Sequence, residues 1–193
     1  MRKILAFFAS IALILLALYP NVYLGIVQVS NELNGVDSLV DANDLSVALI
    51  GENLKQTGES PEEWVMRNIT WTSDYDLYYN LEYWARPDET IMSGRGDCED
   101  RAILTKSLNE YLEMESDIVV QLDHVYILKD GEDYFGVSET TSTFEMVKNV
   151  ILKIPFIRKI VIVSGLVIIW GTSVYLGRQG PGRYKRRGEK PPT

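Results

Sequence analysis

The stretch that decides the fold is Gly94-Arg95-Gly96-Asp97-Cys98-Glu99-Asp100, which leads into apolar residues at helical spacing. Asp97 is a residue type that caps helix N-termini, and acidic residues in a first turn are favoured by the helix dipole. The apolar positions that follow recur every three or four residues: Ala102, Ile103, Leu104, Leu108, Tyr111 and Leu112. The sequence therefore predicts a helix that has Cys98 in its first turn.

Cys98 is the only cysteine, which excludes an internal disulfide framework and a multi-cysteine zinc site. At a helix start, unpaired backbone N–H groups and the helix dipole are expected to lower the pKa of the thiol and to stabilise an oxyanion. Gly94 and Gly96 are expected to let a substrate approach the backbone. The neighbouring carboxylates oppose a thiolate, so we expect a cationic partner nearby. Cys98 is thus the candidate nucleophile.

His124 is the only histidine and lies 26 residues after Cys98. We expect a strand from Val119 to Leu128, a turn at Asp130-Gly131 and a returning strand from Tyr134 to Val137. A helix packed on this sheet would bring the imidazole to the thiol, as the base of a cysteine–histidine site.

The hairpin predicts a third site residue. If Asp130-Gly131 alone forms the turn, residue 129 pairs with 132; if Gly131-Glu132 forms it, residue 130 pairs with 133. Both registers place Glu139 on the face of His124, because side chains alternate along a strand. A carboxylate there would hold the imidazole tautomer. A loop with an odd number of residues would make Ser138 the neighbour instead.

The middle of the chain is acidic: residues 20–150 hold 26 of the 27 carboxylates and 8 of the 19 Lys and Arg. This charge disfavours nucleic acid as a partner. Helix starts are expected at Asp44 and at Ser60-Pro61, ahead of the predicted strands. Helices followed by antiparallel strands indicate an α+β fold. No metal or cofactor is expected, since Asp97 and Asp100 are explained as helix-start residues.

Both ends of the chain resemble membrane spans. Uncharged apolar runs extend from Ile4 to Leu18 and from Ile160 to Leu176. We expect an N-terminal anchor over residues 1–27, with a cleaved signal peptide as the alternative, and a transmembrane helix over 157–177. Basic residues flank the runs at the N-terminus and in the tail, 178–193, so both termini are expected to be cytoplasmic. Residues 28–150 would then form an extracytoplasmic domain tethered to the cell membrane.

The motif around Cys98, the apolar helix after it and then His124-Val125-Tyr126 resemble the transglutaminase-like (papain-like) cysteine catalytic domain. The segment Trp84-Ala85-Arg86-Pro87-Asp88-Glu89-Thr90 is also similar to the segment before the nucleophile in bacterial and archaeal members. The resemblance covers about residues 60–145. It implies an α+β fold with Cys98 as nucleophile and His124 as base. The third residue of the family is most often Asp, a place that Glu139 takes here.

The expected activity is acyl transfer from an amide or peptide bond. Attack by water would make the protein a cysteine peptidase or amidase, whereas attack by an amine would make it a transglutaminase-like acyltransferase. The substrate class is a polypeptide or amide, with envelope or surface proteins indicated by the expected location. The alternative is a catalytically inactive membrane-anchored binding or assembly module on the same fold. A redox role for the thiol is a weaker alternative.

Overall fold

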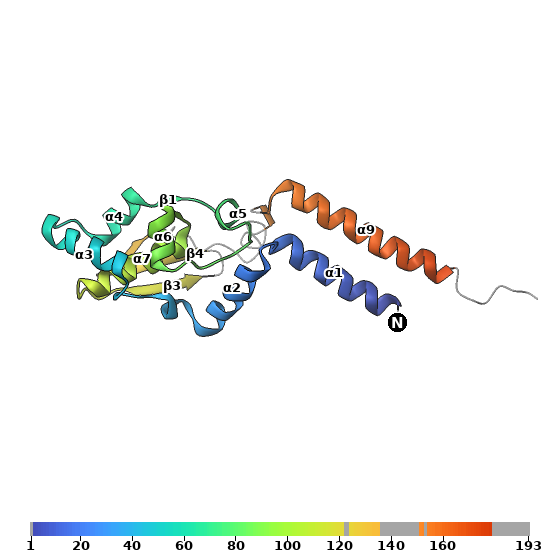
Figure 1. Ribbon diagram of the computed structural model, residues 1–193, viewed down its shortest axis with the longest axis horizontal. Helices are drawn as coiled ribbons and strands as arrows, with labels where there is room; N and C mark the ends of the chain where they lie inside the picture. The colour runs from blue at the N-terminus through green and yellow to red at the C-terminus, as the bar shows by residue number, and fades with distance from the viewer. Residues whose placement is uncertain (1, 122–123, 136–150, 153, 179–193) are drawn as a thin grey trace, which may run out of the picture. The chain divides into compact units, whose positions relative to one another are not determined.

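A computed structural model of the protein describes residues 2–121, 124–135, 151–152 and 154–178 (Figure 1). Its elements, in chain order, are α1 (Arg2–Leu18), α2 (Val22–Asn34), the short 3₁₀ helix η1 (Val36–Leu39), α3 (Leu45–Thr57), α4 (Pro61–Asn68), β1 (Thr70–Trp71), α5 (Asp74–Leu77), α6 (Pro87–Ser93), β2 (Arg95–Gly96), α7 (Cys98–Tyr111), β3 (Asp117–Gln121), β4 (His124–Lys129), β5 (Glu132–Tyr134) and α9 (Phe156–Arg178). The chain divides into two compact units, one with α1 and α9 and the other spanning Leu18–Pro155.

The first unit pairs α1 with α9 in antiparallel orientation. The guanidinium of Arg2 donates to the carbonyl of Leu176, and that of Arg158 donates to the carbonyl of Ala17 at 3.0 Å, so each helix start meets the other helix's end. A Cβ atom at Gly165 would lie 2.5 Å from Cδ2 of Leu13, so the glycine lets the two backbones approach closely. Apolar side chains are exposed along both helices.

One of the two expected spans meets the requirements of length and composition. Phe156–Leu176 is 21 residues long and apolar enough to cross a bilayer, whereas α1, with 17 residues, meets them only together with α2 as a broken span. Helices rise about 1.5 Å per residue, so α1 is slightly short of a hydrocarbon core of about 30 Å. The second span and the topology remain predictions.

Helix α7 is the centre of the second unit. Its residues Leu104 and Leu108 are fully buried against α3 and α4, where Val47, Leu54 and Val65 lie. Its Ala102 packs against the sheet. Buried positions extend over most of α7, including Thr105, Ser107 and Asn109. The predicted apolar stripe is therefore only part of the buried surface of a helix that lies between a helical layer and a sheet.

The sheet that packs on α7 has the antiparallel order β3-β4-β5. Val125 and Ile127 of β4 alternate with more exposed residues and face α7. A second, parallel pair joins β1 to β2, with Thr70 opposite Arg95. The structure is thus a mixed helix and sheet fold in which helices precede most of the strands.

The strand predicted from Val119 to Leu128 is wrong as a single element. It contains two antiparallel strands, β3 and β4, in which Gln121 pairs with His124. The error arose because residues 119–128 include no Gly, Pro or Asn to mark a turn. The turn at Asp130-Gly131 is confirmed, with φ of 54° and 81° and Lys129 opposite Glu132. This is the first of the two registers considered.

A buried polar network ties β4 to the helical layer. Lys129 Nζ lies 3.1 Å from Oε1 of Glu62 at the start of α4, and it donates to Oδ1 of Asn109 in α7 at 3.0 Å. Asn109 in turn donates to Glu62 at 2.8 Å. The three side chains are 9%, 2% and 0% exposed, so each charge or dipole is satisfied within the core. The network holds the far end of β4 in place against α7.

Candidate active site

The cysteine helix begins where two tight backbone features meet. Gly94 ends α6 with φ of 62°, a left-handed conformation that glycine adopts without strain. A Cβ atom at Gly96 would lie only 2.6 Å from Cβ of Asp100. Both glycines therefore have structural reasons to be glycine, and the expectation that they also leave room for a substrate stays a prediction.

Asp100 anchors the segment before α6 to the cysteine helix. It is 0% exposed, and its Oδ1 accepts from the backbone N–H of Ala85 at 2.8 Å. Asp97 makes no side-chain capping hydrogen bond to α7. Asp97 and Asp100 therefore lie at the helix start, as expected, but neither side chain caps α7 in the described part of the chain.

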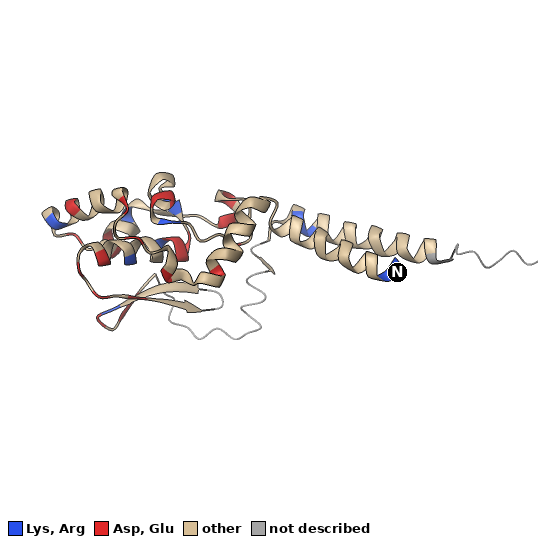
Figure 2. Cartoon of the chain, turned by 60° about the horizontal axis from the view of Figure 1, so that its bottom comes forward, with Lys and Arg blue, Asp and Glu red and all other residues tan. Residues whose placement is uncertain are grey.

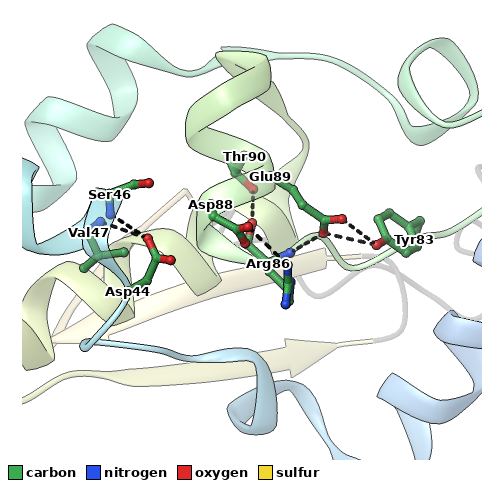
Figure 3. Close-up of polar contacts among 8 residues, drawn as sticks. All are labelled: Asp44, Ser46, Val47, Tyr83, Arg86, Asp88, Glu89 and Thr90. Carbon is green, nitrogen blue, oxygen red and sulfur yellow. Dashed lines mark hydrogen bonds and ion pairs between the residues drawn. The ribbon is translucent and has the colours of Figure 1, made fainter.

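The anchored segment continues into α6, whose first turn is held by its own polar contacts (Figure 3). The carboxylate of Glu89 accepts from the backbone N–H of Arg86 at 2.9 Å and from the hydroxyl of Tyr83 at 3.1 Å. Arg86 also forms an ion pair with Asp88 at 3.1 Å. The motif that precedes the nucleophile is thus a capped helix start fixed against α7.

The thiol of Cys98 is partly buried and donates to Oε2 of Glu99 at 2.9 Å. Burial, followed by the charges of Glu99 and Asp97, raises the pKa of the thiol well above its usual range. The backbone amide of Val125 acts in the opposite direction. The expected lowering of this pKa is therefore wrong for the described arrangement, because desolvation and two carboxylates outweigh the helix N-terminus.

His124 begins β4 and is the residue next to Val125, whose amide lies against the thiol. Its Nε2 is hydrogen-bonded to the backbone carbonyl of Phe135. A carbonyl only accepts, so Nε2 carries a proton and, in the neutral ring, Nδ1 is the acceptor. In the part of the chain that the structure describes, no hydrogen bond joins His124 to Cys98. The catalytic pairing therefore stays a prediction.

Glu139 and Ser138, the two candidates for the third position, lie outside the described residues. Strand β5 ends at Tyr134, and Phe135 adopts a left-handed conformation with φ of 68°. The carbonyl of Phe135 holds the imidazole at the nitrogen that a third side chain would have contacted. The assignment of Glu139 remains a prediction.

Sequence reasoning missed three groups around the site. Glu99 was seen only as a charge that opposes the thiolate, and the Phe135 carbonyl carries no sequence signal at all. Arg101 lies one helical turn after Cys98, its guanidinium 4.8 Å from the ring centre of Phe135. The field of the thiolate raises the pKa of Arg101, while burial, the larger effect, lowers it. The spacing of three residues from Cys98 would have identified it as the expected cation.

Carboxylates gather around the start of α7. Ligand atoms of Asp97, Cys98 and Glu99 lie within 4.8 Å of one another, as do those of Asp74, Glu82 and Glu99, and those of Asp74, Asp97 and Asp100. Burial, followed by the charge of Asp97, raises the pKa of Glu99 to about 7. Burial and the charges of Asp97 and Asp100 raise the pKa of Asp74 to about 11. These sets are the described groups that could hold a metal ion.

Comparison with known families identifies the central part of the chain. Residues 40–126 match a family model described as a transglutaminase-like domain. The matched region includes Cys98 and His124 and ends before Glu139. Comparisons with curated proteins and with solved structures gave no match. The central part of the chain is therefore similar to a transglutaminase-like domain, as the motif around Cys98 predicted.

Proposed function

We propose that the protein is a membrane-tethered thiol enzyme that acts on amide or peptide bonds, with Cys98 as nucleophile and His124 as base. The observation that carries the proposal is the position of the thiol. Cys98 begins the central helix of a transglutaminase-like domain, and its sulfur lies against the amide of Val125, one residue from the imidazole. The hydrogen bond to the Phe135 carbonyl leaves Nδ1 to accept the thiol proton.

The reaction has two steps. Nδ1 of His124 takes the proton of Cys98, the sulfur bonds to the carbonyl carbon, and the C–N bond breaks as the leaving amine receives that proton. Water or an amine then attacks the thioester and releases the thiol. Arg101 is a cation close enough to stabilise the thiolate, and the Phe135 carbonyl supports the imidazole at Nε2, the position that Glu139 or Ser138 would otherwise take.

We place the catalytic domain outside the cytoplasm, with both termini inside. Lys and Arg residues lie near the ends of the apolar helices, whereas Asp and Glu residues are spread over the second unit (Figure 2). On this topology the substrates are envelope or surface polypeptides. Protease added to intact cells should digest the central domain and spare a tag on the C-terminal tail; a protected central domain would contradict the topology alone.

The activity is tested on the full chain in detergent, with peptide libraries supplied with and without an amine donor. Release of a cleaved or deamidated product indicates hydrolysis, whereas incorporation of the amine indicates transfer. Cys98→Ser and His124→Ala should each abolish turnover, whereas Glu115→Gln, an exposed carboxylate after α7, should not. Turnover by Cys98→Ser would exclude the proposed chemistry.

The raised pKa of the thiol favours a second candidate, a membrane-anchored binding module without catalysis. A protonated thiol that donates to Glu99 is a poor nucleophile. On this reading the acidic domain recruits a partner, and cells that carry Cys98→Ser behave like the wild type. A phenotype equal to deletion of the gene would favour catalysis.

A further inference from the structure

Three buried aspartates from two parts of the chain converge beneath the start of α7. Asp74 begins α5, while Asp97 and Asp100 flank the first residues of α7. One carboxylate oxygen from each lies within 4.8 Å of the other two. The side chains are 2%, 6% and 0% exposed. Three carboxylates at this spacing repel one another strongly unless a positive charge or protons intervene.

Two of these carboxylates are fixed by backbone amides and leave one oxygen each without a partner. Asp74 Oδ2 accepts from the N–H of Tyr83 at 2.5 Å, and Asp100 Oδ1 accepts from the N–H of Ala85 at 2.8 Å. Asp74 Oδ1 and Asp100 Oδ2 are buried and have no hydrogen-bond partner in the described part of the chain. An unsatisfied buried oxygen is costly, so this pair points to a missing ligand.

A neutral oxygen lies near the same place. The hydroxyl of Tyr78 is buried and has no hydrogen-bond partner among the described residues. Tyr78 is the C-cap of the short helix that Asp74 begins, and its ring packs against that of Tyr83 with the ring centres 4.6 Å apart. The donor set is thus made of oxygens, which hard divalent cations prefer.

We propose that Asp74, Asp97 and Asp100 bind a hard divalent cation, for which calcium is the probe. Calcium accepts oxygen ligands in flexible geometries at about 2.3–2.6 Å, whereas magnesium requires a near-ideal octahedral site. The cation fastens α5 to the cysteine helix, below Cys98.

The test measures binding to the full chain in detergent after treatment with a chelator. Calcium chloride is titrated by calorimetry, and thermal unfolding is followed in parallel; we expect one ion per chain and a higher unfolding temperature. Asp74→Asn keeps an acceptor for the Tyr83 amide but removes a ligand charge, so calcium should bind at least about tenfold more weakly. Asp76→Asn, an exposed neighbour on the same short helix, should bind calcium like the wild type.

Two results would overturn the site. Wild-type protein that shows neither heat nor a thermal shift with calcium would mean that protons alone satisfy the cluster. Equal affinity of the Asp74 and Asp76 variants would place any bound ion elsewhere.

If Asp74→Asn does not fold, terbium provides the readout on the wild type. Excitation of tyrosine should produce terbium emission that calcium displaces and that Tyr78→Phe reduces; no such emission overturns the proposal. Cys98→Ala should bind calcium unchanged, so the outcome is independent of thiol chemistry.

Discussion

Replacing Glu99 by Gln should make the thiol of Cys98 more reactive. The carboxylate oxygen lies 2.9 Å from the sulfur, and burial raises the pKa of Glu99 to about 7. Above that pH the carboxylate is ionised and opposes formation of the thiolate. Glu99→Gln removes this charge and leaves a side chain of the same shape, so the pKa of the thiol should fall. It stays above that of a free thiol, because burial is the largest cause of the shift.

The size of the effect follows from Coulomb's law. Two unit charges about 4 Å apart interact by roughly 4 kcal/mol at an effective dielectric constant of about 20, which corresponds to about three pKa units. At a pH where the thiolate is the minor form, the thiolate fraction rises about tenfold for each unit by which the pKa of the thiol falls. A less basic thiolate is also a weaker nucleophile, with a Brønsted coefficient of about 0.4–0.5, so the net gain in rate is roughly 30- to 60-fold.

The assay is alkylation by iodoacetamide, followed by intact-protein mass spectrometry between pH 6 and 10 in the presence of a chelator. The chain has one cysteine, so every added mass reports Cys98. Wild-type Cys98 should react more slowly than a free thiol at pH 8, and Glu99→Gln should accelerate it, while Glu115→Gln should not. An unchanged rate in Glu99→Gln, or a wild-type thiol that outpaces a free thiol below pH 7, would refute the reasoning.

Three further changes test contacts around the site by thermal and urea unfolding of the full chain in detergent. Gly96→Ala should destabilise by about 1–3 kcal/mol, because the new methyl group overlaps Asp100; an unchanged midpoint contradicts the close approach. Lys129→Met should cost about 3–5 kcal/mol by leaving the Glu62 charge buried, and the double change with Glu62→Leu should recover most of it; no recovery would mean that packing dominates. Gln28→Ala should lower the free energy of unfolding by about 1–3 kcal/mol and speed hydrogen exchange at the backbone amide of Trp84, which donates to Gln28. Slow exchange at Trp84 in the variant would show that this amide has another acceptor.

Local signals predicted the beginnings of the helices well. Asp44 accepts from the amides of Ser46 and Val47, and Ser60 accepts from that of Glu63, as expected of N-cap residues. The start of α7 at Cys98 and the turn at Asp130-Gly131 are likewise confirmed. Each of these features depends on residues within four positions of one another, which is the range over which sequence patterns act.

The features that sequence could not predict depend on contacts between distant residues. Lys129 and Glu62 are 67 positions apart, and their ion pair exists only because β4 ends beside α4. The parallel pairing of Thr70 with Arg95 has no local signal. The pKa of Cys98 was predicted in the wrong direction mainly for the same reason: the helix position and the charge of Glu99 are local, whereas burial, the largest cause of the shift, comes from the tertiary fold.

Helix α2, which follows the N-terminal apolar run, is part of the second compact unit, and this bears on the two interpretations of that run. Asn21 exchanges hydrogen bonds with Asn80, its amide donating at 3.1 Å and its carbonyl accepting at 3.0 Å. Gln28, 1% exposed, accepts from the amide of Trp84 at 2.8 Å. Trp84 precedes the residue that Asp100 anchors, so α2 and α7 hold the same segment from two sides. Cleavage of a signal peptide between Asn21 and Gln28 would remove Asn21 or cut α2, whereas an uncleaved anchor leaves this support for the cysteine helix intact.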